Sequence, residues 1–417
     1  MQDHLQFQGW GRRQQKGLLK AWWQRLERAP ETGTPVAYLF ISGAVEELLR
    51  AFGYEIALPE VTALNCAIRQ ASIEYILRAE DIGYSQDVCG YVKNDIGLLL
   101  SGNRSPMGKL PPPSLLVCNY SGCTTYIKWF EALAEFYHAP LFILDVPYLR
   151  TTGVLASDID YIVGQLHELI DLCERQTGRP FDEARLRTIL AHARAAEDRW
   201  VQVLETARHT PAPFDAYFEA VYFMAPIYIL RGLPETVEYY DGLLRELTER
   251  IEHGIGPVPE ERFRVVIEGP PPWPALRDFW DMFKQWGAVC VASTYSKVGG
   301  LWDASGVRHD PERPLESIAE YAIHCYVNWG LHHRRQLLLE YYTQYRADAI
   351  VIHSVKSCRS FAAGEADFRE MFVKEMGIPT LFIESDLVDP RYFQKAQMKN
   401  RIDAFFESLE HRQLVHG

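Results

Sequence analysis

Two cysteines occupy equivalent positions in a pattern that occurs twice along the chain. Each copy begins with a short apolar run, at residues 115–117 and 350–352, and the cysteine follows six residues after the last apolar residue. A helical stretch and another apolar run come next, so each copy predicts a strand–loop–helix–strand unit. Cys123 and Cys358 are therefore expected at the carboxyl ends of parallel strands, the edge at which open α/β sheets bind their ligands.

The neighbours of both cysteines are small and polar, as with Ser121 and Ser357, and each cysteine precedes a predicted helix. A helix N-terminus lowers the pKa of a thiol and favours the thiolate, which is the form that binds metals. Two unrelated core cysteines are the alternative, because free cysteine is commonly buried. The duplication favours one cofactor shared between two lobes.

Cys89 lies in a helical pattern and becomes a third ligand only if its helix covers the cleft. Iron–sulfur clusters are held by cysteine thiolates, usually four for a cubane, so three protein thiolates would leave one iron open to substrate. Cys118, five residues before Cys123, is an additional candidate, with the strand interior as its alternative position. The core interpretation is favoured for the other cysteines, Cys66, Cys173, Cys290 and Cys325.

The composition argues against several classes of protein. A chain of 417 residues with 47% hydrophobic residues suits two or three globular domains. A net charge of −12 argues against a general nucleic-acid-binding protein, which would need a basic face. No apolar run reaches the roughly 18 residues of a membrane span, and no secretory signal precedes the first helix pattern. We expect a cytoplasmic protein without membrane contact, whose eight cysteines are thiols or metal ligands rather than disulfides.

Alternating strand and helix patterns divide the chain into four predicted parts. These are an N-terminal helical arm (1–30), a first α/β lobe (31–157), a helical bridge (158–260) and a second α/β lobe (261–417). Strands that alternate with helices predict open, mostly parallel sheets. The fold class is therefore α/β, with two sheet lobes joined by a helical segment and a cofactor in the cleft between them.

Nucleotide-binding motifs are absent from the sequence. Residues 102–109 resemble a phosphate-binding loop, but five residues separate the glycines, no Ser or Thr follows Lys109, and three prolines come next. A phosphate loop needs a strand before it and a helix after it. A G-x-G-x-x-G fingerprint is also missing, so we expect this chain to bind no nucleotide.

Polar side chains that follow predicted strands of the second lobe have two interpretations. Glu268, Asp386 and Asp389 could orient a substrate, but capping of a helix or of a loop backbone is favoured. The His-His-Arg-Arg run at 332–335 could bind an anion such as a phosphate group. A solvated helix start is the favoured interpretation of that run.

Several motifs together resemble a known enzyme family. They include Asp-Val-Cys-Gly-Tyr-Val-Lys at 87–93 and Lys-Ser-Cys at 356–358. The chain resembles the benzoyl-CoA reductase/2-hydroxyacyl-CoA dehydratase family, and within it the B-type catalytic subunits of ATP-dependent benzoyl-CoA reductases. The other matching segments are 120–123 with 128–131, 268–271, 291–300 and 384–393.

The resemblance implies an iron–sulfur cluster between the lobes, most simply [4Fe-4S], with Cys89, Cys123 and Cys358 as ligands. It implies a heterotetramer in which a second catalytic subunit pairs with this chain and two ATPase subunits drive electrons into the catalytic pair. Ferredoxin would be the upstream donor. The implied reaction reduces benzoyl-CoA to a cyclohexadiene thioester, and the sequence singles out no proton donor.

Two segments depart from the family pattern, namely Cys118 and the stretch 328–335. Four alternatives therefore stay open: a 2-hydroxyacyl-CoA dehydratase subunit, a double-cubane reductase of small molecules, a non-catalytic electron-transfer subunit and a cluster-free binding protein. Additional ligands for a double cubane would come from Cys118, Cys66 or Cys325. Ser42, Glu60 and Lys297 are candidate substrate contacts.

Overall fold

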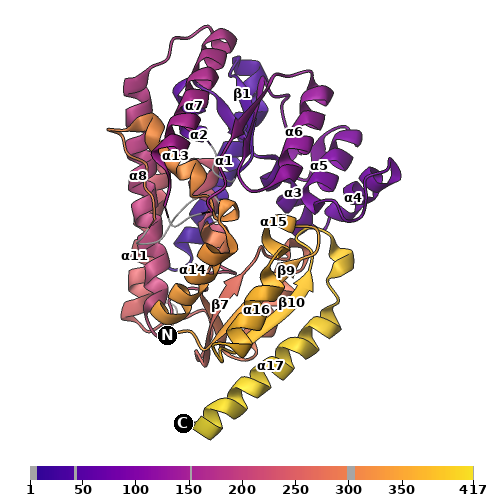
Figure 1. The fold of residues 1–417 in the computed structure, drawn as a ribbon, viewed down its shortest axis with the longest axis vertical. Coiled ribbons are helices and arrows are strands. Elements are labelled where there is room, and N and C mark those ends of the chain that lie inside the picture. Colours follow the sequence, from indigo (N-terminus) through magenta and orange to yellow (C-terminus); the bar gives the residue numbers. More distant parts are fainter. Residues whose placement is uncertain (1–6, 42–44, 151–152, 298–305, 417) are drawn as a thin grey trace.

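The computed structural model describes residues 7–41, 45–150, 153–297 and 306–416. Two four-stranded sheets, each parallel along every strand pair, form the centres of two α/β lobes, and helices cover them (Figure 1). The predicted α/β class with two parallel-sheet lobes is confirmed. A helix both long enough and apolar enough to cross a membrane is not found in the described parts of the chain.

The first sheet has the strand order β2–β1–β5–β6. The two central strands, β1 and β5, are buried almost throughout, as expected for a parallel sheet with both faces covered, whereas the edge strand β6 is partly exposed. Helix α2 (Glu46–Ala51) connects β1 to β2, and α6 (Thr124–Tyr137) connects β5 to β6. The strands are β1 (Val36–Leu39), β2 (Glu55–Ala57), β5 (Leu115–Tyr120) and β6 (Leu141–Asp145).

Helices that precede β5 complete the first lobe. Trp22 on the first helix donates its indole N–H to the carbonyl of Ile56 at 2.9 Å, so this helix packs on the edge of the sheet. Residues 102–109 contain a short hairpin rather than the strand–loop–helix of a phosphate site. The elements are α1 (Trp10–Thr32), α3 (Pro59–Ile68), α4 (Ser72–Asp81), α5 (Gly90–Leu100), β3 (Arg104–Ser105) and β4 (Gly108–Lys109).

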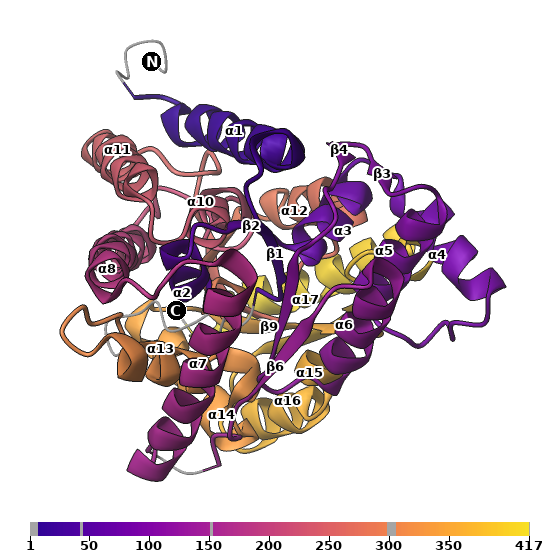
Figure 2. The same cartoon turned by 90° about the horizontal axis from the view of Figure 1, so that it is seen from above.

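A helical segment follows the first lobe. Asp182 begins its second long helix by accepting a hydrogen bond from the N–H of Arg185, a standard N-cap contact. Helices α8 and α11 lie side by side at one flank of the molecule, and α4, α5 and α6 lie at the other (Figure 2). The elements are α7 (Ala156–Thr177), α8 (Glu183–Glu205), α9 (Ala220–Phe223), α10 (Ala225–Ile229) and α11 (Pro234–Glu252).

The second sheet has the strand order β10–β9–β7–β8. Its strands are β7 (Phe263–Glu268), β8 (Ala288–Ser293), β9 (Ala349–Val355) and β10 (Thr380–Ser385). Its helices are α12 (Leu276–Lys284), α13 (Pro314–Ile323), α14 (Leu331–Gln344), α15 (Arg359–Ala362), α16 (Glu365–Lys374) and α17 (Lys395–His416), with the short turns η2 (Trp273–Ala275), η3 (Tyr295–Lys297), η4 (Tyr326–Asn328) and η5 (Pro390–Tyr392).

The predicted duplicated unit is present in both lobes. In the first lobe β5 leads through Cys123 into α6 and back to β6, and in the second β9 leads through Cys358 into α15 and α16 and back to β10. Each returning strand pairs in parallel with the strand that began the unit. The units differ in their helix, because α6 is continuous over 14 residues whereas Gly364 separates α15 from α16.

Candidate metal centre

Three cysteines stand at the N-caps of three α-helices. Cys123 and Cys358 cap α6 and α15, where the duplicated pattern predicted them. Cys89 is the N-cap of α5. The sequence pattern had indicated a position within a helix, whereas the structure places Cys89 at the start of one. These three cysteines are partly exposed, whereas the remaining five, Cys66, Cys118, Cys173, Cys290 and Cys325, are buried.

The three thiols influence one another electrostatically. Burial, and next the charge of Cys123, raises the pKa of Cys89 to about 12. Burial, followed by the charges of Cys89 and Cys123, raises the pKa of Cys358 well above its usual value. Hydrogen bonds between residues next to the cysteines, Gly90 to Ser357 and Ser360 to Gly122, bring the three segments together.

This donor set fits a positively charged cofactor that binds thiolates. Like charges that face one another favour the protonated thiols, and metal binding requires the deprotonated forms, so a cation would offset the repulsion. Among the described residues, no three His, Cys, Asp or Glu side chains converge closely enough to hold a single metal ion. Cysteine thiolates are the ligands of iron–sulfur clusters, in which each thiolate binds a different iron.

Two serines beside Cys358 join the three cysteine segments. Ser357 Oγ accepts a hydrogen bond from the N–H of Gly90, the residue after Cys89, at 3.1 Å. Ser360 Oγ donates to the carbonyl of Gly122, the residue before Cys123, at 3.0 Å. The sequence interpretation missed this role of the serines, although the small polar residues around the cysteine were its signal.

Gly122 allows the first lobe to approach the second closely. Its φ of +76° lies in the left-handed region that favours glycine. A Cβ at this position would stand 2.0 Å from the carbonyl oxygen of Val327 in η4. Cys123 is therefore brought to the lobe boundary by a residue that cannot carry a side chain there.

An aromatic side chain is part of the same electrostatic environment. The pKa of Tyr126 on α6 is raised well above its usual value by burial first and then by Cys123, Glu60, Cys358 and Cys89. Tyr126 is therefore influenced by all three cysteines, and sequence reasoning did not single it out.

Of the three predicted substrate contacts, Glu60 has a side chain within the described part of the structure. Its side chain is 4% exposed, it accepts a hydrogen bond from the N–H of Ile41 at 2.7 Å, and burial raises its pKa well above the usual value. Ser42 lies outside the described residues. Lys297 ends η3, and its side chain is likewise outside the described part of the structure.

An apolar cavity of about 220 Å³ opens beside Glu60. Helices α1, α3, α9 and α10 form most of its wall, with apolar side chains such as Leu19, Val61 and Met224. Ile41, Trp273 and Tyr295 complete the wall. Burial raises the pKa of Tyr295, and the charges of Glu60 and Cys358 add to the effect.

The cavity also has two cationic side chains, Lys16 on α1 and Arg69 after α3. An otherwise apolar pocket with a few charged groups is the usual form of a site for a small organic ligand.

Cys118 belongs to the interior of the first lobe. It is fully buried in β5, and burial raises the pKa of its thiol to about 12, with the charges of Cys123 and Glu60 adding to the effect. The strand interior, the alternative considered for this residue, is therefore its position. Cys66 and Cys325 are also fully buried.

The interpretation of the 332–335 run as a solvated helix start is wrong for Arg334. This side chain is 3% exposed, and it donates to Glu268 and to the carbonyls of Ser360 and Phe361, the latter two at 3.1 Å. The anion that Arg334 binds is therefore the buried side chain of Glu268 and not an external phosphate. Glu268 is accordingly neither a helix cap nor an open substrate contact. The spacing of 66 residues between the partners hides the pair from sequence analysis.

Asp386 and Asp389 satisfy loop backbone, as favoured from the sequence. Asp386 Oδ1 accepts from the N–H groups of Val388 and Asp389, each at 3.1 Å, and Asp389 Oδ1 accepts from the N–H of Arg391 at 3.0 Å.

Comparison with known proteins agrees with this architecture. The family model of the 2-hydroxyglutaryl-CoA dehydratase D-component matches residues 42–409. The benzoyl-CoA reductase B-subunit of Thauera aromatica is 43% identical over 95% of this chain and 94% of its own length. The alpha subunit of (R)-2-hydroxyisocaproyl-CoA dehydratase of Clostridioides difficile is 27% identical over 93% of both chains, and that of (R)-phenyllactyl-CoA dehydratase of Clostridium sporogenes is 27% identical over 91% of both. The chain belongs to the benzoyl-CoA reductase/2-hydroxyacyl-CoA dehydratase family of enzyme subunits.

Proposed function

We propose that this chain is the iron–sulfur catalytic subunit of an ATP-dependent aromatic acyl-CoA reductase, with benzoyl-CoA as the substrate. The observation that carries the proposal is the position of three cysteines at three helix N-termini, in segments joined by the hydrogen bonds of Ser357 and Ser360. The 43% identity to a benzoyl-CoA reductase subunit, against 27% to the dehydratase subunits, favours the reductase.

Cys89, Cys123 and Cys358 would hold the cluster, most simply [4Fe-4S]. When bound, such a cluster supplies electrons at potentials that reach about −700 mV and an iron with an open coordination position. The N-termini of α5, α6 and α15 direct positive dipole ends toward the thiolates and stabilise their charge. Tyr126 covers the site and excludes water, which would otherwise quench a radical formed from the substrate.

The cavity beside Glu60 would hold the aromatic acyl group. An apolar cavity of about 150 Å³ is enough for benzene, so 220 Å³ suits an aromatic ring with its thioester. Lys16 and Arg69 would meet the phosphates of the CoA. Burial of Glu60 favours the protonated carboxyl, which can donate a hydrogen bond from its Oε to the thioester carbonyl. Ser42 and Lys297 are proposed as further substrate contacts.

The proposed assembly contains a second catalytic subunit and two ATPase subunits, with ferredoxin as the electron donor and the cytoplasm as its compartment. The family members compared above are named as subunits, which supports partners for this chain. Exposed apolar side chains occur in β6 and in the segments before and after it along the chain, and such side chains are a feature of protein–protein interfaces. These side chains are Phe136, Ile143, Tyr148, Leu155 and Tyr161.

A 2-hydroxyacyl-CoA dehydratase subunit is the second candidate function. The family model and the dehydratase alpha subunits support it. Both candidates use the same cysteines, and they differ in whether the product is more reduced than the substrate.

The experiment is anaerobic purification with the partner subunits, followed by iron and sulfide quantification, product analysis and EPR with and without benzoyl-CoA. About four irons per chain, the content of one cubane, a spectrum that shifts with the thioester and a cyclohexadiene product support the proposal. About eight irons would indicate a double cubane. Iron without a thioester response would indicate an electron-transfer subunit, and a chain without iron contradicts the cluster.

Matched variants sharpen this experiment. Cys89→Ser, Cys123→Ser and Cys358→Ser are each expected to lose most of the iron and all ring reduction. Cys118→Ser, at a buried strand position, is the control and is expected to keep its iron. Loss of iron in Cys118→Ser alone would contradict the proposed ligand set.

A further inference from the structure

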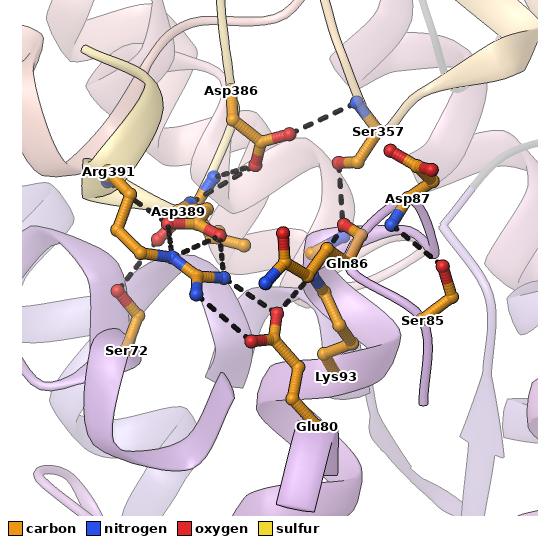
Figure 3. Close-up of polar contacts among 12 residues, drawn as sticks. Ser72, Glu80, Ser85, Gln86, Asp87, Lys93, Ser357, Asp386, Asp389 and Arg391 are labelled. Carbon is orange, nitrogen blue, oxygen red and sulfur yellow. Dashed lines mark hydrogen bonds and ion pairs between the residues drawn. The ribbon is translucent and has the colours of Figure 1, made fainter. Parts of the chain in front are cut away.

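A chain of polar contacts crosses between the lobes beside the metal centre (Figure 3). Glu80 on α4 and Lys93 on α5 come from the first lobe. Arg391 in the turn η5 and Asp389, the residue before that turn, come from the second lobe. Arg391 donates Nη1 to Glu80 Oε2 at 3.0 Å and Nη2 to Glu80 Oε1 at 2.6 Å. This two-point arginine–carboxylate contact fixes orientation as well as distance.

Lys93 extends the contacts toward Cys89. It is 1% exposed, and its Nζ donates to Glu80 Oε1 at 2.9 Å and to the carbonyl of Gln86 at 2.7 Å. Gln86 lies in the loop that leads to Cys89, so Lys93 holds that loop against α4. Asp389 also binds Arg391, with Oδ2 at 2.6 Å from Nη2. The cations Lys93 and Arg391 thus meet the carboxylates of Glu80 and Asp389, and the buried charges of Lys93 and Asp389 are both paired.

The contacts return to the metal centre through Asp386. Its Oδ1 accepts from the turn that leads to η5, and its Oδ2 accepts from the N–H of Ser357 at 3.1 Å. Ser357 in turn accepts from the N–H of Gly90. The route therefore begins and ends beside cysteines, because Gly90 follows Cys89 and Ser357 precedes Cys358.

The two lobes leave little free space at this point. A Cβ on Gly90 would stand 2.4 Å from Val388 Cγ2 and 3.0 Å from Asp386 Oδ1. A further hydrogen bond joins the lobes where Ser72 Oγ on α4 donates to the carbonyl of Val388 at 2.7 Å. Movement of the second-lobe turn would therefore move the start of α5.

We propose that this inter-lobe latch, made of Glu80, Lys93, Asp386, Asp389 and Arg391, sets the position of Cys89 relative to Cys358 before any cofactor binds. Glu80 and Arg391 are positioning residues, because they act on the cysteines through the loop and the turn and touch neither thiol. The inference rests on the proposed role of these cysteines as ligands.

The test is the rate of alkylation of each cysteine by iodoacetamide in the full-length metal-free chain, read by mass spectrometry. Arg391→Gln and Glu80→Gln are expected to raise the rate at Cys89 about tenfold, the change that follows from a loss of ~1.4 kcal/mol in holding the loop closed. Arg78→Gln is the control, since Arg78 lies on the same helix and binds only Glu74 in an exposed pair within that helix. It is expected to leave the rate unchanged.

Ser72→Ala, which removes one neutral hydrogen bond between the lobes, is a milder variant that tests the latch if the charge variants do not fold. It is expected to raise the rate at Cys89 by about two- to fivefold, within the range for one hydrogen bond. In the assembled complex, the charge variants are expected to shift the EPR-monitored midpoint potential of the cluster, and Arg391→Lys is expected to restore part of that shift.

Unchanged alkylation of Cys89 in folded Arg391→Gln and Ser72→Ala would contradict the latch, whatever the catalytic activity. A wild-type complex that contains no iron would contradict the proposed function instead, and the alkylation result in the metal-free chain would still decide the latch.

Discussion

The two cysteine units share one order of elements but hold their cysteines by different means. In the first lobe α6 is a continuous helix of 14 residues that buries Trp129, Phe130 and Leu133 and leaves much of its surface exposed. In the second lobe β9 is buried along all seven of its residues, and the helix after Cys358 ends after four. The position of the cysteine is the same, whereas its support differs.

The difference follows from helix length. A helix as short as α15 cannot hold itself, because its nucleation cost is not recovered. Arg334 supplies the missing support by binding the carbonyls of Ser360 and Phe361 at its end. The longer α6 needs one anchor on its inner face, where Trp129 donates to Asp95 Oδ2 at 2.8 Å. The two copies of the unit thus place their cysteines alike, although the helix of one copy is stabilised by its length and that of the other by a buried arginine.

The largest effect is expected from breaking the support of the second unit. Arg334→Met would leave Glu268 buried without its cation, and loss of one partner of a buried pair costs about 3–5 kcal/mol. Urea unfolding of the metal-free chain, followed by circular dichroism, measures the change. Arg335→Met, at the neighbouring and partly exposed position, is the control with an expected change under ~1 kcal/mol. Equal losses in both variants would contradict the special role of Arg334.

The next effect concerns the glycine of each unit. Gly122→Ala is expected to lose about 2–4 kcal/mol, because a Cβ would add left-handed strain and meet the backbone oxygen of Val327. Gly364→Ala is expected to lose only ~1–2 kcal/mol, since its φ of +90° is strained but its nearest neighbour is the movable end of Leu331. Thermal unfolding of both variants tests the order. A greater loss for Gly364→Ala would reverse the comparison between the units.

A smaller effect is the pH dependence given by two buried carboxyls, Glu365 on α16 of the second unit and Asp95 on α5, which accepts the hydrogen bond of Trp129 in the first unit. Burial raises the pKa of Glu365 to about 8 and that of Asp95 to about 7, so the folded chain holds these protons more tightly than the unfolded chain. The stabilisation is complete below the unfolded pKa values and is lost as the pH rises through the folded values.

Between pH 5 and 8 the unfolding free energy should therefore fall less steeply in Glu365→Gln than in wild type, by up to ~1.4 kcal/mol per pH unit. In Asp95→Asn the unfolding free energy should likewise fall less steeply with pH than in wild type, mainly below pH 7. Unfolding curves at five pH values measure both slopes, and parallel slopes for wild type and Glu365→Gln would contradict the raised pKa.

The smallest effect is expected on the exposed face of the first unit. Lys128 and Glu131 form a pair at 2.7 Å, but their side chains are 78% and 46% exposed. Lys128→Met should change the unfolding free energy by less than ~0.5 kcal/mol and leave the iron content unchanged. A clear loss of iron would show that the first unit also depends on charge.

The sequence predicted what depends on local pattern. The spacing of Cys123 and Cys358 after apolar runs placed both at helix starts, because strand and helix periods can be counted along the chain. Cys89 came from the family resemblance, since its own surroundings look helical. The partners Glu268 and Arg334 could not be paired, because their meeting depends on how β7 and α14 pack.

Cross-lobe contacts were also beyond sequence reasoning. Ser360 reaches Gly122, and Arg391 reaches Glu80, across separations of 238 and 311 residues. Nothing in the local pattern of either partner indicates such a contact. The small residues beside the cysteines indicated close packing, but they did not indicate which segment packs against them.

The division of the cysteines between the lobes also sets the order in which they are synthesised. Cys89 and Cys123 leave the ribosome together, whereas Cys358 follows only after the helical segment and most of the second sheet have been made. Because domains fold as they emerge, the nascent chain exposes two thiols of the set long before the third exists. Insertion of the proposed cluster, which would need all three thiols, would therefore succeed only on a nearly finished polypeptide.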